Sequence, residues 1–233
     1  MTTPSDEQKR RVGEAAAALV QSGMIVGLGT GSTAAWFVRA LAGRMAAEKL
    51  DVRGVPTSTV TKNLAEVLGI PLLELNQVEI DLTVDGADEI GPGLALIKGA
   101  GAALLREKLV WEASRRCVVI GDAAKRSPLL GKSPLPIEVI AFGHESTSRR
   151  LSDALSECDI GIPPRLRIRD GEVVITDSGN VIYDVVCGAI PEPSMLADAL
   201  KSVTGVVEHG LFLDLADEAL IAGEDGGVER LAP

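Results

Sequence analysis

An apolar strand that runs directly into a glycine-rich turn and then a helix is the feature that most constrains this fold. Residues 24–28 have the pattern of a short buried strand, residues 29–33 are Gly-Thr-Gly-Ser-Thr, and residues 34–45 have the spacing of a helix. Such a turn places backbone N–H groups and the positive end of a helix dipole at one point, which suits a phosphate group. The alternative is a tight turn that binds nothing.

Two familiar glycine-rich motifs fit this turn poorly. The P-loop ends in Gly-Lys-Ser/Thr, and the turn contains no lysine, so a nucleoside triphosphate is not the expected ligand. Gly29, Gly31 and Ala34 match the looser dinucleotide pattern, but that pattern needs an acid at the end of the next strand. Asp51 instead begins that strand. A phosphate group of another kind is therefore the favoured interpretation.

Polar clusters follow four of the predicted strands. The clusters occupy residues 29–33, 57–61, 85–89 and 122–125. In a parallel sheet the carboxyl ends of the strands lie at one edge, where open α/β sheets place their ligand crevices. We therefore expect these clusters to converge. The hydroxyl groups of residues 57–61 are interpreted either as helix caps or as contacts to a polar ligand.

Glu107 is the one charged residue on the apolar face of a helix predicted to begin near Ala102. The positions on this face are 100, 103, 104, 107, 110, 111 and 114. Arg106 and Lys108 are expected to point elsewhere. A carboxylate on a buried face is costly unless it is paired or has a raised pKa, and a raised pKa suits a general base. Alternatively, Glu107 lies at the edge of the stripe and pairs with a neighbouring Lys or Arg.

The composition changes at residues 127–136, where three prolines and a Gly-Lys pair interrupt the alternation of strands and helices. We expect a Rossmann-like catalytic domain of residues 1–131 and 208–233. Residues 132–207 are expected to form a smaller α+β lobe with a split β-α-β, ferredoxin-like order. The fold class is therefore α/β, with an open, mostly parallel sheet and a second lobe.

Charge and cysteine content exclude several classes of function. Lys and Arg number 23 against 33 Asp and Glu, and the net charge of −10 argues against a nucleic-acid or membrane partner. The odd number of cysteines without paired spacing, Cys117, Cys158 and Cys187, indicates free thiols in a reducing cytoplasm. His144 and His209 lack ligand spacing, so no metal site is expected. Without a signal core or a long apolar run, the chain is expected to be cytoplasmic.

Four motifs together resemble ribose-5-phosphate isomerase of the A type. They are GTGST at 29–33, DGADE at 85–89, KGAGAALLREK at 98–108 and GDAAKR at 121–126. The resemblance runs from the first helix to the last strand. It implies an aldose-ketose isomerase of the non-oxidative pentose phosphate pathway that interconverts D-ribose 5-phosphate and D-ribulose 5-phosphate. It also implies a homodimer or homotetramer with no metal and no cofactor.

The resemblance further implies a set of site residues. Glu107 is expected to move the proton between C2 and C1 through an enediolate, and Lys98 to stabilise the developing oxyanion. Asp85 and Asp88 are expected to orient sugar hydroxyls, with one of them assisting ring opening. The expected substrate-binding residues are Thr30, Gly31, Ser32, Thr33, Gly86, Ala87, Gly99, Ala100, Gly101 and Lys125.

Less specific interpretations exist for three of these residues. Lys98 is alternatively a solvated loop charge, Asp88 a helix cap and Lys125 a surface lysine. The sequence also departs from the family at Ala100, where members commonly have glycine, so a methyl group must be accommodated in a loop whose backbone approaches the ligand.

Two other functions were weighed. A sugar-phosphate-binding regulatory domain would need a DNA-binding module, which residues 1–22 do not supply. A coenzyme A transferase-like enzyme would use the glutamate as a nucleophile. It would leave the phosphate turn and the two aspartates without a role.

Overall fold

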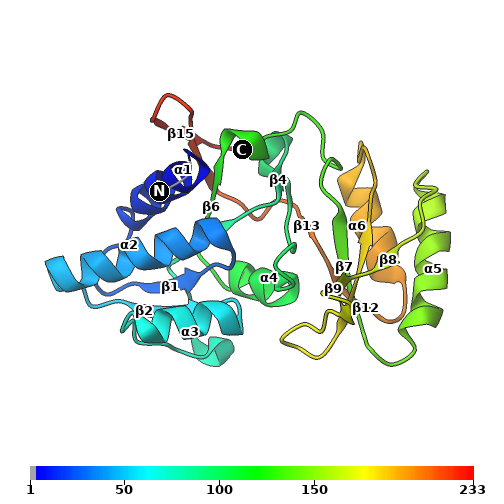
Figure 1. The fold of residues 1–233 in the computed structure, drawn as a ribbon, viewed down its shortest axis with the longest axis horizontal. Helices are drawn as coiled ribbons and strands as arrows, with labels where there is room; N and C mark the ends of the chain where they lie inside the picture. Colours follow the sequence, from blue (N-terminus) through cyan, green and yellow to red (C-terminus); the bar gives the residue numbers. More distant parts are fainter. Residues whose placement is uncertain (1–3) are drawn as a thin grey trace. The chain divides into compact units, whose positions relative to one another are not determined.

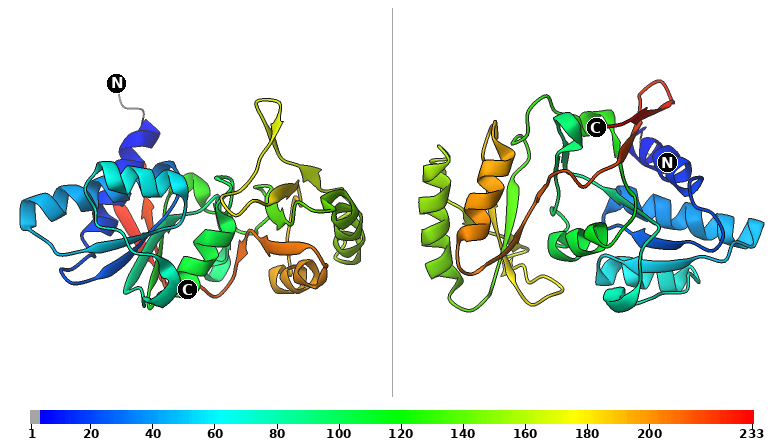
Figure 2. Two further views of the ribbon diagram at one scale, coloured as in Figure 1. Left: turned by 90° about the horizontal axis from the view of Figure 1, so that it is seen from below. Right: turned by 180° about the vertical axis from the view of Figure 1, so that it is seen from behind.

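The computed structural model describes residues 4–233, which form two compact units. Unit 1 contains the chain up to Ala87 together with Arg106–Arg126 and Asp214–Pro233, and unit 2 contains Asp88–Leu105 and Ser127–Leu213. Figures 1 and 2 show the ribbon of these elements. Unit 2 is therefore made of two segments inserted into the sequence of unit 1.

Unit 1 is built on a six-stranded sheet with the order β15-β14-β6-β3-β1-β2. The strands are β1 (Ile25–Leu28), β2 (Arg53–Pro56), β3 (Leu82–Gly86), β6 (Cys117–Asp122), β14 (Glu218–Ala222) and β15 (Val228–Leu231). All pairs are parallel except β14 with β15. From β1 the chain continues to β2 on one side and to β3 on the other, and such a reversal is where α/β sheets form ligand crevices.

Helices cover both faces of this sheet. Successive side chains of a strand point to opposite faces, so apolar residues on both faces need a covering layer. Val26 and Leu28 of β1 share one apolar cluster with α1 (Pro4–Ala17) and α2 (Ser32–Glu48). A smaller cluster on the other side joins Val55, Ile80 and Val110. Val110 belongs to α4 (Leu104–Glu112), while α3 (Thr59–Val67) follows β2. The central strands are thus buried on both faces, which explains the apolar runs of β1 and β6.

Unit 2 contains an antiparallel sheet with the order β12-β7-β11-β8. Its strands are β7 (Leu135–Val139), β8 (Arg165–Leu166), β11 (Val181–Val185) and β12 (Val206–His209), and its helices are α5 (His144–Glu157) and α6 (Pro193–Ser202). Alternate residues Leu135, Ile137 and Val139 of β7 pack with Leu151 of α5 and Leu196 of α6. This order is the predicted split β-α-β arrangement.

Short elements complete unit 2. A three-stranded sheet joins β13 (Leu211–Phe212), β5 (Leu96–Ile97) and β4 (Glu89–Ile90), and a hairpin joins β9 (Ile168–Arg169) to β10 (Glu172–Val173). The predicted hairpin signal Asp170-Gly171 is confirmed, because both residues have the positive φ that such turns require. The 3₁₀ turn η2 (Pro92–Leu94) also belongs to unit 2, while η1 (Leu75–Gln77) and η3 (Ala123–Lys125) belong to unit 1.

Three sequence predictions need correction. Residues 88–105, 127–131 and 208–213, expected in the first lobe, group with unit 2. The first and last of these segments are joined by the pairing of β5 with β13. The strand predicted at 72–75 forms only an isolated bridge between Leu72 and Gly54 before η1 begins. The helix predicted from Ala102 begins at Leu104, because Ala102 has a φ of 62°. That the two lobes fold as independent domains stays a prediction.

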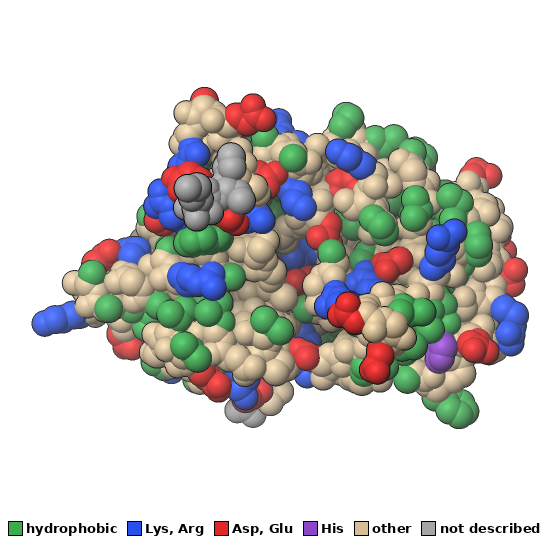
Figure 3. Space-filling model, in the orientation of Figure 1, with side chains coloured by type: hydrophobic (Ala, Val, Ile, Leu, Met, Phe, Trp, Pro, Cys, Tyr) green, Lys and Arg blue, Asp and Glu red, His purple; other side chains and the backbone are tan. Residues whose placement is uncertain are grey.

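The charged side chains of the surface include both signs, as expected from 23 Lys and Arg and 33 Asp and Glu in the sequence. On the face drawn in Figure 3, Lys and Arg side chains are interspersed with Asp and Glu rather than gathered in one patch. Within residues 4–233, no helix has the length and apolar character needed to cross a membrane. The three cysteines are free thiols, of which Cys117 is buried and Cys158 and Cys187 are half-buried. Burial raises the pKa of Cys187 to about 11.

Candidate active site

The predicted site residues belong to both units. Unit 1 carries residues 30–33, 85–87, Glu107 and Lys125, and unit 2 carries Asp88 and residues 98–101.

The glycine-rich turn of unit 1 leads from β1 into the N-terminus of α2. Gly31 is the N-cap residue with a φ of 108°, and it offers no side chain to cap the first N–H groups of the helix. Ser32 is exposed and Thr33 is half-buried. Uncapped N–H groups at the positive end of a 17-residue helix form an arrangement suited to an anion.

Hydroxyl groups of residues 57–61 hold this turn in place. Thr30 Oγ1 lies 2.7 Å from both Thr57 Oγ1 and Ser58 Oγ. Thr57 and Thr61 donate to the carbonyl oxygens of the β1 segment, at 3.0 Å to Leu28 and 2.9 Å to Gly29. Ser58 also caps α3, because its Oγ accepts the N–H of Thr61 at 3.1 Å. The cap interpretation of the hydroxyls is thus confirmed for Ser58, and the cluster additionally holds the turn.

Asp85 ties the end of β3 to the same turn. Its side chain is 0% exposed, and its Oδ1 accepts the N–H groups of Thr30 at 3.0 Å and Gly86 at 2.7 Å. A methyl group added at Gly29 would lie 2.3 Å from Oδ1 of Asp85, so this position requires glycine. The convergence expected of the first and third polar clusters is therefore present within unit 1.

Glu107 lies in the first turn of α4 and is 4% exposed. Its neighbours on the same face, Leu104, Val110 and Trp111, are also buried. The edge position considered from sequence is wrong for Glu107. Lys108, which was expected to point away from this face, is buried as well. α4 therefore carries a carboxylate inside the protein, where an ionisable group has a high desolvation cost.

Lys125 ends the 3₁₀ turn that follows β6. The turn starts from Asp122, whose Oδ1 accepts the N–H of Ala124 at 3.0 Å. Lys125 is half-buried. The polar cluster after β6 is therefore formed as predicted, and Asp122 is the capping residue of its turn.

Lys98 of unit 2 is buried rather than a solvated loop charge. It is 2% exposed, and its Nζ lies 5.3 Å from the centroid of the Phe212 ring, a cation–π distance. Its N–H donates to the carbonyl oxygen of Gly210 at 2.9 Å. Gly99 follows with a φ of 110°, and a methyl group there would lie 3.0 Å from Leu104 Cβ. Ala100 is exposed, so its extra methyl group is accommodated.

The acids after β3 hold two further segments of unit 2. Asp88 Oδ2 accepts the N–H of Ala100 at 2.9 Å, so Asp88 anchors the loop after Lys98 and is not a helix cap. Buried Glu89 accepts N–H groups from three successive residues, Gly131, Lys132 and Ser133, at 3.3, 3.3 and 2.8 Å. The density of acids in this motif thus has a structural reason in addition to any catalytic one.

The hydrogen bonds that Arg167 makes with Asp184 and with the loop after Lys98 were not predicted from the sequence. Arg167 Nη1 donates to the carbonyl oxygens of Gly99 at 2.8 Å and Ala100 at 3.3 Å, and Nε donates to Asp184 at 2.7 Å. A single arginine between two short strands carries no local signal of this role. Its carbonyl partners lie 67 and 68 positions away, so only the fold reveals this role.

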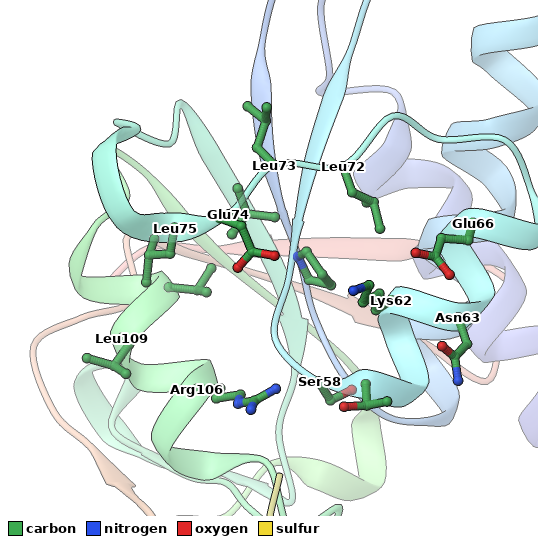
Figure 4. A pocket seen from close by; sticks show the side chains of 14 residues that line it. Ser58, Lys62, Asn63, Glu66, Leu72, Leu73, Glu74, Leu75, Arg106 and Leu109 are labelled. Carbon is green, nitrogen blue, oxygen red and sulfur yellow. The ribbon is translucent and has the colours of Figure 1, made fainter. Parts of the chain in front are cut away.

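A pocket of about 650 Å³ lies in unit 1, bounded by α3, residues 72–75 and α4. Figure 4 shows Lys62 of α3 and Arg106 of α4 directed toward the space between the two helices, with Glu66 and Glu74 also at its rim. Two cations and two carboxylates give this pocket no net charge. Its lining residues, within the described chain, include none of the predicted site residues.

Among residues 4–233, no group of three or more His, Cys, Asp or Glu side chains is placed to hold a metal ion. The absence of a metal requirement stays a prediction.

Comparison with known proteins is consistent across sequence and structure. The sequence model of the family ribose 5-phosphate isomerase A (phosphoriboisomerase A) matches residues 53–226. Ribose-5-phosphate isomerase A of Caulobacter sp. strain K31 is 68% identical over 230 residues, covering 98% of this chain and 99% of the relative.

Two solved structures are also similar. Ribose 5-phosphate isomerase from Plasmodium falciparum has a TM-score of 0.93 and 39% identity, covering 98% of this chain and 99% of that one. A structure of D-ribose-5-phosphate isomerase in complex with phospho-erythronic acid has a TM-score of 0.91 and 36% identity, with the same coverage of 98% and 99%.

Proposed function

Because the chain belongs to the ribose 5-phosphate isomerase A family and interconverts ribose 5-phosphate and ribulose 5-phosphate, we propose that Glu107 is its proton-transferring base. Moving the carbonyl from C1 to C2 requires a base that takes the C2 proton and returns it at C1 through an enediolate. The observation that carries the proposal is a carboxylate 4% exposed in the first turn of α4, next to the buried Leu104. One buried carboxylate suffices for both transfers.

Lys98 is assigned to the oxyanion of the enediolate. A positioned cation lowers the free energy of a developing negative charge most where water is excluded, and Lys98 is 2% exposed. The packing of Nζ against Phe212 restricts the ammonium group before substrate arrives. The N–H of Ala100 donates to Asp88, so in this assignment the loop contributes the N–H groups of Gly99 and Gly101.

The 5-phosphate is assigned to the N-terminus of α2, at Gly31, Ser32 and Thr33. The uncapped first turn of α2 and the exposure of Ser32 support this assignment. Thr30 has a positioning role in the proposal, because its N–H donates to Asp85 and its hydroxyl contacts Ser58. Gly86, Ala87 and Lys125 complete the substrate-binding set proposed from the family resemblance.

Asp85 and Asp88 are assigned to the sugar hydroxyl groups, and one of them to opening of the furanose ring. Each carboxylate already holds a backbone segment, Asp85 the turn after β1 and Asp88 the loop after Lys98. Substrate hydroxyls bound by these carboxylates would thus be placed relative to fixed backbone. The assignment is tested by comparing Asp85→Asn and Asp88→Asn on the furanose and open-chain forms: the variant that has lost ring opening is slower only on the furanose.

The phosphate assignment is tested with substrates that differ only at C5. Inorganic phosphate is expected to compete with ribose 5-phosphate, and unphosphorylated ribose is expected to be a very poor substrate. Ser32→Pro removes one N–H of the first turn and should raise KM for ribose 5-phosphate while leaving the slow turnover of ribose unchanged. Comparable turnover of ribose and ribose 5-phosphate would contradict the assignment.

We also propose that the enzyme works as a cytoplasmic homodimer or homotetramer without a nucleic-acid partner. The family resemblance supports the oligomer, and the net charge of −10 is unfavourable for binding a polyanion. Light scattering coupled to size-exclusion chromatography tests the first part, and a monomer at working concentration would contradict it.

A further inference from the structure

Arg167 of unit 2 contacts two partners at once. Its Nε and Nη2 donate to the two carboxylate oxygens of Asp184 at 2.7 and 2.5 Å, while Nη1 donates to the carbonyl oxygens of Gly99 and Ala100. The Arg167 side chain is 11% exposed and that of Asp184 is 25% exposed. The guanidinium group is therefore held in one orientation between a strand and a loop.

Asp184 is a firm anchor for this contact. It lies on β11, which pairs with β7 on one side and with β8 on the other. The backbone of Arg167 is bound to the same sheet, because its N–H donates to the carbonyl oxygen of Ile182 at 2.8 Å. A planar guanidinium can bind a carboxylate with two donors and still direct a third at a carbonyl, which an ammonium group cannot do in the same geometry.

The peptide between Gly99 and Ala100 is held at both ends by this arrangement. Arg167 binds its carbonyl oxygen at 2.8 Å, and Asp88 accepts its N–H at 2.9 Å. The loop and the residue after it contain two positive φ angles: 110° at Gly99, which glycine adopts readily, and 62° at Ala102, which is uncommon for alanine. A backbone in sparsely populated conformations keeps its shape only when its surroundings determine it. Arg167 supplies that determination for the segment directly after Lys98.

We propose that Arg167, anchored by Asp184, is a positioning residue that orients the loop of Lys98–Gly101 for stabilisation of the enediolate. The proposal rests on the role assigned to this loop above. Arg167 acts through the loop rather than on the substrate. An interaction made only with the transition state affects kcat rather than KM, and loss of one oxyanion donor costs roughly 10²- to 10³-fold. Arg167→Ala is expected to lower kcat by roughly 10²-fold with little change in KM.

The test compares Arg167→Ala with Arg115→Ala, a control that removes an exposed arginine paired with Glu79 in unit 1. The control is expected to keep wild-type kcat. Methylguanidinium added to Arg167→Ala should restore part of kcat, whereas methylammonium should not, because only the guanidinium reproduces the fork. Arg167→Lys keeps the charge but is expected to stay slow. Hydrogen exchange at residues 98–102 should be faster in Arg167→Ala than in the control.

Wild-type kcat in folded Arg167→Ala, or a reduced kcat that methylguanidinium does not change, would overturn the proposal. If Arg167→Ala does not fold, Asp184→Asn keeps the shape of the anchor while weakening it, and wild-type kcat in that variant would also overturn the proposal. Lys98→Met distinguishes failure of the positioning role of Arg167 from failure of the role assigned to the loop. If Lys98→Met is slow and Arg167→Ala is not, only the positioning role fails; if Lys98→Met is as fast as wild type, the role assigned to the loop fails first.

Discussion

At the scale of single residues, three carboxylates in and after β3 accept hydrogen bonds from backbone N–H groups. Asp85 accepts N–H groups of the turn after β1, Asp88 accepts that of Ala100, and Glu89 accepts three from residues 131–133. The sequence shows that acids gather at a strand end, but hydrogen-bond partners distant in sequence cannot be predicted from it. Arg167 illustrates the limit, since its carbonyl partners lie in a loop that only the fold brings near.

Gly29→Ala tests the contact between the turn and Asp85. The added methyl group would lie 2.3 Å from Asp85 Oδ1, so either the turn or the carboxylate must move. We expect a loss of about 1–3 kcal/mol in the free energy of unfolding, as for other overpacked sites, and a higher KM for ribose 5-phosphate. Denaturant unfolding and initial rates measure the two effects.

Gly43→Ala is the matched control. A methyl group added at Gly43, within α2, meets no atom within 4 Å. It should raise stability by about 0.5–1 kcal/mol through helix propensity alone, with KM unchanged. Equal behaviour of the two variants would contradict the role given to Gly29.

At the scale of elements, the sequence predicts which strands exist better than it predicts where they end and which strands they pair with. Continuous apolar runs mark β1 and β6 because both faces of the sheet are covered, whereas β3 is buried although it contains Thr83 and Asp85. The run at 72–75 contains Glu74, and only Leu72 bridges to the sheet. The start of α4 depends on the positive φ of Ala102, which an alanine gives no reason to expect.

Ser58→Ala tests the coupling between α3 and the phosphate turn. Ser58 caps α3 and also accepts from Thr30 Oγ1, so its loss should destabilise the helix and loosen the turn together. We expect about 0.5–2 kcal/mol of lost stability and a higher KM for ribose 5-phosphate. Ser156→Ala, which removes an exposed hydroxyl bound to Ser152 O within α5, should change stability by less than about 0.5 kcal/mol. If Ser58→Ala is destabilised but keeps an unchanged KM, Ser58 caps α3 without affecting the phosphate turn, and the predicted coupling is contradicted.

At the scale of the whole molecule, two apolar cores form from a chain that passes between them more than once. Leu41 lies in the core of unit 1 and Leu151 in that of unit 2. The change of composition at 127–136 predicts one boundary, because prolines interrupt the pattern there. The grouping of residues 88–105 with unit 2 depends on pairing of β5 with β13, two short strands that leave only a weak signal in the sequence.

Catalysis by the whole enzyme is expected to need no metal. In the proposed mechanism, a carboxylate base and a lysine would supply the proton transfer and the charge stabilisation for which other enzymes use a Lewis acid. Prolonged treatment with EDTA followed by gel filtration should leave kcat unchanged. A loss of activity that a divalent cation restores would contradict this expectation, and a loss that dilution alone reverses would indicate inhibition by the chelator.

The role of Glu107 is tested most directly by solvent deuterium exchange in Glu107→Gln, with Glu112→Gln, an exposed change at the end of the same helix, as the control. Wild type and control should incorporate deuterium from D₂O at the carbon that receives the proton. Glu107→Gln should lose isomerisation and this exchange together, by roughly 10²- to 10⁴-fold, because the shape is kept and the base removed. Its affinity for ribose 5-phosphate should be retained. Exchange at the wild-type rate in Glu107→Gln would contradict the account and move the base to Asp85 or Asp88.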